Sequence, residues 1–220
     1  ILKIKFNTLS MKQILFILFL FSSTLQAEEN FVEGIDYELI NDDPSLYVSK
    51  KNNKIKIIEA FWYGCPHCYV FEDYLEKWET RKQGDIKFIN MPVVFNKTWL
   101  LHARAFYTMK ELDNFKDFHK KFFYAYHEQQ RTFASKESVV NFLVSQGADK
   151  ENVEKNFSSE LVSKKVQEAN YMLETYQIDS VPAMIINDKY KISGRMAKTY
   201  ERMLEISDFI IDLERKSRSK

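Results

Sequence analysis

The chain has 220 residues, of which 29% are charged and 45% are hydrophobic, and its formal net charge is +1. This length suits one domain, or one domain with a large insertion, and the near-neutral charge excludes the basic footprint of a nucleic-acid binder. The only two cysteines, Cys65 and Cys68, lie in a single C-x-x-C. A framework of structural disulfides and a four-cysteine zinc or iron–sulfur site are therefore excluded.

The N-terminal residues have the pattern of an export signal. A short basic start follows Met11, the run Ile14–Phe21 is unbroken and apolar, and a small or polar stretch ends at Ala27. A membrane span needs about 20 apolar residues, so this run is too short for an anchor. We expect residues 1–27 to comprise upstream residues and a signal peptide cleaved after Ala27. The exported protein would then work in an oxidising compartment.

The rest of the sequence predicts strands and helices in an α/β order. A short strand, a buried central strand, a third strand and a hairpin are predicted at Tyr37–Leu39, Ile55–Trp62, Ile86–Val94, Ala183–Ile186 and Lys189–Ile192. One helix follows Gly64 and ends at Gly84, and a last helix covers Thr199–Arg215.

A long helical stretch interrupts this order. From about Thr98 to Gln177 every periodic segment has helical spacing, and Ser135 is a predicted N-cap within it. We therefore expect an α/β domain formed by residues 28–97 and 178–220. An all-helical domain of residues 98–177 would be inserted into it.

The C-x-x-C lies where a strand has ended and a helix begins. Cys65 is thus a predicted N-cap, with Pro66 at the first helical position, where a missing N–H costs nothing. Free N–H groups of the first turn and the positive end of the helix dipole favour a thiolate there, and His67 adds a donor or a charge. Cys68 lies one turn further on and can close a disulfide. This arrangement suits a nucleophile at Cys65 and a resolving thiol at Cys68.

Two other interpretations of the motif fit the residues less well. Half of a zinc site would need two more ligands, but His102, His119 and His127 lack the usual ligand spacing. A structural disulfide between Cys65 and Cys68 would close almost no loop and stabilise little. We therefore expect no metal and no cofactor, and we expect the three histidines to be packing or surface residues.

Five stretches together resemble the DsbA-type thiol–disulfide oxidoreductases, close to the DsbA/DsbL group. They are the export-like N-terminus, E-A-F-W-Y-G-C-P-H-C-Y at Glu59–Tyr69, the helical block, V-P-A-M-I-I-N-D-K-Y at Val181–Tyr190 and the last helix. The resemblance implies an α/β thioredoxin fold with an inserted all-helical domain. It also implies that the Val181–Pro182 bond is cis, that this loop packs against the cysteines, and that the backbone before Pro182 pairs with the substrate peptide.

Glu59 is the remaining candidate. In the strand it faces the same side as Ile57 and Phe61, so burial is predicted, although an edge-facing, solvated glutamate remains the alternative. The resemblance implies that a buried acid here relays a proton to Cys68, and burial would raise its pKa towards a useful range. Some relatives pair this acid with a lysine on the next strand. The nearest register here holds Asn90, which puts such a pair in doubt.

The resemblance implies a bacterial periplasmic dithiol oxidase. Its partners would be unfolded exported proteins with free thiols and a DsbB-type membrane quinone reductase that reoxidises it, and we expect a monomer that binds no nucleic acid. A thiolate at Cys65 stabilises the reduced protein, so the protein gives its disulfide away. Two alternatives remain open: a disulfide isomerase or reductase of exported proteins, and a peptide-binding chaperone whose cysteines are incidental.

Overall fold

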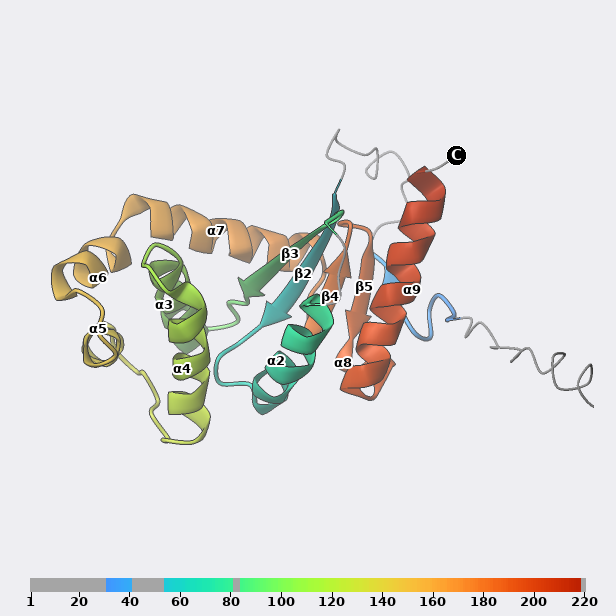
Figure 1. The fold of residues 1–220 in the computed structure, drawn as a ribbon. Helices are drawn as coiled ribbons and strands as arrows, with labels where there is room; N and C mark the ends of the chain where they lie inside the picture. The colour runs from blue at the N-terminus through green and yellow to red at the C-terminus, as the bar shows by residue number, and fades with distance from the viewer. Residues whose placement is uncertain (1–30, 41–53, 81–83, 219–220) are drawn as a thin grey trace, which may run out of the picture. The chain divides into compact units, whose positions relative to one another are not determined.

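A five-stranded mixed sheet in the order β1-β5-β4-β2-β3 forms the centre of the α/β part (Figure 1). The structure is a computed structural model that describes residues 31–40, 54–80 and 84–218. The strands are β1 (Glu38–Leu39), β2 (Ile55–Phe61), β3 (Ile86–Pro92), β4 (Ala183–Ile186) and β5 (Tyr190–Ser193). The expected export signal lies outside the described residues. Within the described residues, no helix is long and apolar enough to cross a membrane.

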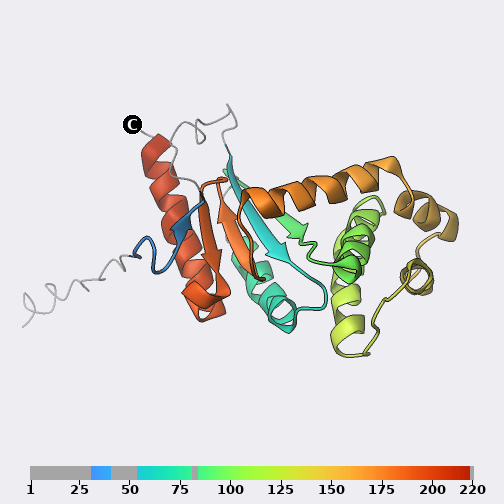
Figure 2. The ribbon, with the colours of Figure 1, turned by 180° about the vertical axis from the view of Figure 1, so that it is seen from behind.

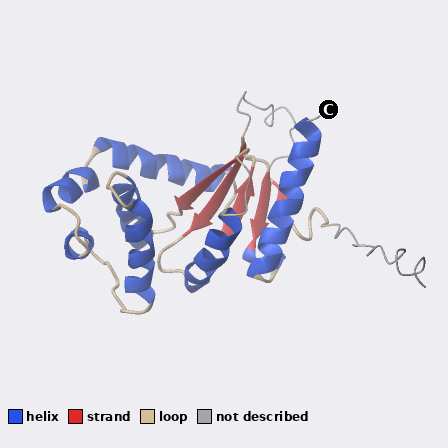
Figure 3. Cartoon of the chain, in the orientation of Figure 1, coloured by secondary structure: helices blue, strands red, loops and turns tan. Residues whose placement is uncertain are grey.

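Helices make up most of the remaining described chain (Figure 3). They are α2 (Pro66–Glu79), α3 (Lys97–Lys110), α4 (Phe115–His127), α5 (Lys136–Ser145), α6 (Lys150–Phe157), α7 (Glu160–Thr175), α8 (Gly194–Ala197) and α9 (Tyr200–Arg218). Helices α3 to α7 all lie between β3 and β4 in the chain, as expected of a thioredoxin fold with a helical insertion. The expected fold class is therefore confirmed.

The side chains of β2 alternate between two covered faces of the sheet. Ile55 and Ile57 pack with buried side chains of α2 and α9, whereas Ile58 and Ala60 pack with Ala169 of α7 on the other face. Figure 2 shows the end of α7 reaching the sheet from behind. This two-residue period places Glu59, between Ile57 and Phe61, on the face beneath α2. The helix that begins with the cysteines therefore lies over the buried acid.

The insertion has its own aromatic core. Phe122 and Phe123 of α4 and Phe142 of α5 are buried in one cluster with Phe61 and Tyr63, the residues at the end of β2 and just after it. Burying one such ring contributes about 1.5–3 kcal/mol. The insertion is therefore packed directly against the chain that leads into Cys65.

Most predicted elements match the structure within a few residues, and three features differ from the prediction. The helix expected to end at Gly84 ends at Glu79, where the hydroxyl of Thr80 donates to the carbonyl of Lys77 at 2.8 Å. The short helix α8 was not predicted, because four residues are too few for a helical period. β2 is an interior strand, but the middle of the sheet is β4.

Candidate active site

Cys65 is the N-cap of α2, as predicted. Its backbone is extended, Pro66 occupies the first turn, and the backbone N–H of Cys68 donates to the Cys65 Sγ at 3.4 Å. In this structure both cysteines are thiols. The strand–turn–helix geometry thus aims the free N–H groups of the helix at one sulfur.

This environment lowers the pKa of Cys65 to about 6. The largest cause is the hydrogen bond from the Cys68 side chain, which outweighs the opposing effect of burial. The backbone N–H groups of Cys68 and His67 and the charge of His67 lower the pKa further. At pH 7 a thiol with this pKa is about nine-tenths thiolate. Cys65 is therefore both a ready nucleophile and a good leaving group.

Cys68 has the opposite character. Its side chain is fully buried, and burial raises its pKa well above the usual value of a thiol. The hydrogen bond to Cys65 and the charges of Cys65 and Glu59 raise it further. Cys68 therefore keeps its proton when reduced, and it must gain one whenever the disulfide opens.

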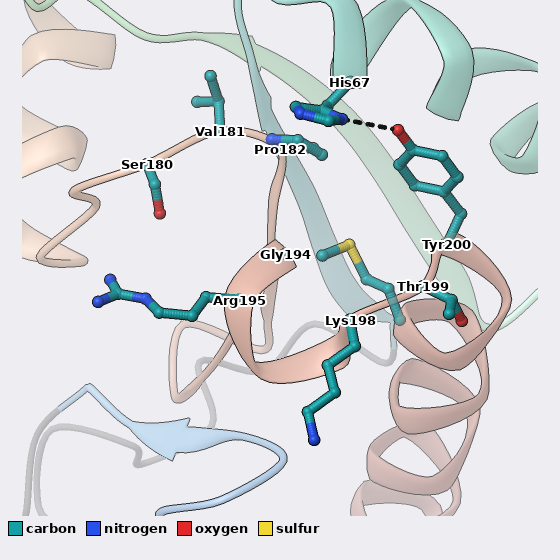
Figure 4. A pocket seen from close by; sticks show the side chains of 10 residues that line it. His67, Ser180, Val181, Pro182, Gly194, Arg195, Lys198, Thr199 and Tyr200 are labelled. Carbon is teal, nitrogen blue, oxygen red and sulfur yellow. Dashed lines mark hydrogen bonds between the residues drawn. The ribbon is translucent and has the colours of Figure 1, made fainter.

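His67 is exposed and reaches towards the last helix. A hydrogen bond of 3.0 Å joins its Nδ1 to the hydroxyl of Tyr200, the first residue of α9 (Figure 4). The Tyr200 ring stacks on Phe71 with centroids 5.6 Å apart and contacts Tyr74 at 5.3 Å. Tyr200 therefore holds the histidine of the motif in place, and no sequence pattern pointed to it.

The loop before β4 lies beside Cys65. The Val181–Pro182 peptide bond is cis, as the resemblance implied. The carbonyl oxygen of Val181 lies 3.5 Å from the Cys65 Sγ. Pro182 and Val181 also line a cavity of about 540 Å³ together with His67 and Tyr200 (Figure 4). The reactive sulfur thus lies next to Val181, a residue that lines a cavity large enough for several side chains of a bound peptide.

Glu59 is fully buried, which confirms the predicted burial and excludes the solvated alternative. Burial is the largest cause that raises its pKa well above the usual value, and the nearby charge of Glu72 is the next. Glu59 pairs in register with Asn90 of β3, and the Asn90 amide donates to Glu59 Oε2 at 2.8 Å. An uncharged amide therefore stands beside Glu59 at this register, so the doubt about a Glu–Lys pair was justified.

A second buried polar cluster lies next to Glu59. Glu72 of α2 faces His119 of α4, with Oε1 and Nε2 3.4 Å apart, and His119 Nδ1 lies 2.6 Å from the Tyr63 hydroxyl. Burial raises the pKa of Tyr63 well above its usual value, so the hydroxyl keeps its proton. The charge of Glu72 is the second cause, after burial, that raises the pKa of Glu59.

The other two histidines of the insertion hold the same loop. The Trp62 indole donates to His102 Nδ1 at 3.0 Å, and His102 Nε2 donates to the Thr132 carbonyl at 3.3 Å. His127 Nε2 donates to the carbonyl of Tyr63 at 2.8 Å. The three histidines pack, which is one of the two roles predicted for them, but no sequence pattern indicated that all three converge on the residues before Cys65. Within the described residues, no three His, Cys, Asp or Glu side chains are grouped as a metal site would require.

Cys65 leaves readily as a thiolate, and Cys68, one turn away, is a buried thiol that can re-form the disulfide bond. Such a pair can pass a disulfide to another molecule and take it back. The fold and this pair define the class of thiol–disulfide oxidoreductases with the thioredoxin fold. A family model described as Thioredoxin matches residues 42–206.

The relatives place the chain more narrowly within this class. The thiol:disulfide interchange protein DsbA of Pseudomonas aeruginosa PAO1 is 32% identical over 202 residues, which are 91% of this chain and 93% of that protein. The DsbA of Burkholderia cepacia is 31% identical over 178 residues, 81% and 83% of the two chains. The crystal structure of Pseudomonas aeruginosa DsbA matches with a TM-score of 0.80 at 30% identity, covering 86% of this chain and 97% of that one. The oxidoreductase NmDsbA1 from Neisseria meningitidis matches with a TM-score of 0.73 at 25% identity, covering 86% and 96%. The chain belongs to the DsbA-type thiol:disulfide interchange proteins of the thioredoxin family, which confirms the resemblance found in the sequence.

Proposed function

We propose that this oxidoreductase is a dithiol oxidase of the bacterial periplasm, which donates its Cys65–Cys68 disulfide to unfolded exported proteins. The observation that carries the proposal is the contrast between the two thiols. The pKa of Cys65 is lowered to about 6, whereas that of Cys68 is raised well above its usual value. A stabilised Cys65 thiolate favours the reduced protein, so the oxidised protein tends to give its disulfide to the thiols of a substrate.

The reaction proceeds in two exchanges. A substrate thiolate attacks the Cys65 sulfur, the Cys65–Cys68 bond breaks, and its electron pair goes to the Cys68 sulfur. Glu59, whose raised pKa leaves it protonated, supplies the proton that Cys68 takes up. The second substrate thiolate then attacks the substrate sulfur of the mixed disulfide, and Cys65 leaves as a thiolate. The substrate is oxidised by two electrons and the Cys65–Cys68 pair is reduced.

The surroundings of the pair are assigned as follows. Val181 and Pro182 bind the substrate backbone beside Cys65, and Pro66 and His67 tune the thiol. Residues 28–97 and 178–220 act as the thioredoxin-like domain, and residues 98–177 as the insertion. The carbonyl oxygen of Val181 near the Cys65 sulfur supports the first assignment, because it places a backbone acceptor beside the sulfur that the substrate attacks.

Export and reoxidation complete the proposal. Residues 1–27 direct the chain to the periplasm, and a DsbB-type quinone-linked membrane protein reoxidises the monomeric enzyme. Support comes from the signal-like apolar run before Ala27 and from membership in the DsbA group. Fractionation of cells expressing the full chain tests this directly: a shortened protein in the periplasmic fraction is expected, and a full-length cytoplasmic protein would contradict it.

The direction of exchange is tested with two substrates. The oxidised protein should convert a reduced two-cysteine peptide to its disulfide within one turnover, and Cys65→Ser should abolish this. A rapid rearrangement of scrambled ribonuclease with slow peptide oxidation would instead favour an isomerase or reductase. Biological activity that survives in the Cys65→Ser variant would favour a chaperone with incidental cysteines.

A further inference from the structure

The cavity beside Cys65 has an apolar part and a cationic part. Pro182 and Met203 contribute apolar surface near His67, whereas Arg195 and Lys198 are the charged side chains that line it. Figure 4 shows Lys198 in the lower part of the view and Arg195 at the left, with His67 and Pro182 in the upper part. Among the described residues that line the cavity there is no Asp or Glu. A peptide bound at the cysteine would therefore meet positive charge that the lining does not neutralise.

The two cations differ in how far their charge is already compensated. Arg195 Nη2 lies 3.1 Å from Asp179 Oδ2, so a carboxylate already occupies one side of it. Lys198 has no carboxylate within ion-pair distance in the described part of the chain. Its charge helps to lower the pKa of Asp36, but that carboxylate already binds Arg202 at 2.7 Å. Lys198 thus carries the uncompensated charge of the cavity.

Lys198 is also close enough to the reacting sulfur to contact a residue near a substrate cysteine. It precedes Tyr200 by two residues, so their Cα atoms are within about 7 Å of each other. The Tyr200 hydroxyl in turn binds His67, the residue between the two cysteines. An extended substrate advances about 3.3 Å per residue, so a side chain two or three positions from the substrate cysteine reaches this part of the cavity.

We propose that Lys198, assisted by Arg195, makes this enzyme selective for polypeptides that carry an acidic residue within three positions of the cysteine to be oxidised. The proposal rests on the proposed oxidase function and names the substrate class of the same site. An ion pair at such a partly solvated position is weak, and a like-charged pair is repelled by a similar amount. A glutamate peptide should therefore react about 3- to 10-fold faster than its lysine counterpart at low salt. The difference should shrink as salt shortens the screening length from about 10 Å at 0.1 M to about 3 Å at 1 M.

The test uses three peptides with two cysteines and a flexible spacer, differing only in a Glu, Gln or Lys placed two residues from the first cysteine on either side. The rate constant for oxidation by the full-length oxidised protein is measured for each peptide. Lys198→Glu should reverse the order of the Glu and Lys peptides, and Lys198→Gln should remove it. A glycine is not used because Lys198 has a φ of 67°, which glycine would relax. Asp179→Asn, which releases the charge of Arg195, should strengthen the preference.

Three controls separate the possible outcomes. Lys164→Glu, a charge reversal on the exposed face of α7, should leave the order unchanged. A glutamate also changes the reactivity of the peptide's own thiol, and comparing the ratio of the Glu-peptide rate to the Lys-peptide rate between protein variants cancels this effect. The rate with the Gln peptide reports whether each variant still folds and reacts. Equal rates for the three peptides on the unmodified protein, or an order that survives Lys198→Glu, would overturn the selectivity alone. Failure to oxidise even the Gln peptide would instead overturn the proposed oxidase function.

Discussion

The hydrogen bond from Cys68 is the largest cause of the acidity of Cys65, and this can be tested in a protein with a single thiol. Cys68→Ala removes the donor, whereas Cys68→Ser keeps a hydroxyl at the same place as a matched control. A hydrogen bond to a charged group contributes about 1.5–3 kcal/mol, which corresponds to about 1–2 pH units. The pKa of Cys65, now about 6, should therefore rise to between about 7 and about 8 in the alanine variant. It should stay closer to 6 in the serine variant.

The consequence at pH 7 is large enough to measure. The thiolate fraction of Cys65 should fall from about nine-tenths to between about a half and a tenth in Cys68→Ala. The rate of alkylation by iodoacetamide, followed from about pH 4 to about pH 10, reports this fraction directly. The N–H groups of the helix remain in both variants, so some lowering of the pKa persists. An alanine variant whose titration midpoint matches that of the serine variant would refute the assignment of the Cys68 side chain as the main cause.

Two further predictions concern the buried groups. Glu59→Gln should stabilise the protein by up to about 3 kcal/mol at pH 7. The raised pKa of Glu59 means that this residue costs no folding free energy below about pH 4.5, where it is protonated in the folded and the unfolded protein. As the pH rises, the unfolded protein loses this proton more readily than the folded one, so Glu59 destabilises the fold and glutamine does not. Urea unfolding should show the gain at pH 7 and little of it at pH 4.5, and equal stability of the two proteins at both pH values would contradict the assignment. Tyr63→Phe and His119→Leu, alone and combined, should show a coupling free energy of about 1–2 kcal/mol in urea unfolding. Additive effects would mean that the 2.6 Å contact does not stabilise the fold.

The parts of the site that follow from local rules could be predicted from the sequence. The N-cap position of Cys65 follows from a strand, a glycine and a Pro66 in succession. The burial of Glu59 follows from the two-residue period of a strand covered on both faces. Its partner Asn90 follows from the register of neighbouring parallel strands, in which the lysine at 87 has the wrong parity.

The parts that depend on the packing of distant segments could not be predicted. His102, His119 and His127 reach the loop before Cys65 only because the insertion folds back onto the end of β2, and their spacing along the chain carries no trace of this. Tyr200 and Lys198 meet the site because the chain turns between α8 and α9, beside the start of α2. Contacts of this kind arise from tertiary structure, which hydrophobic periodicity does not encode.

The redox potential of the Cys65–Cys68 pair tests the central claim most directly. The lowered pKa of Cys65 stabilises the reduced form fully above about pH 9, and this contribution is lost as the pH falls through about 6. At pH 7 this stabilisation of the reduced form amounts to about 1.4 kcal/mol, or about 30 mV towards an oxidising potential. In the same reduced form, Cys68 and Glu59 are buried and protonated. Equilibration with glutathione should therefore give a potential above the value of about −270 mV typical of thioredoxin. A potential at or below that value would contradict the account of this chain as a disulfide donor.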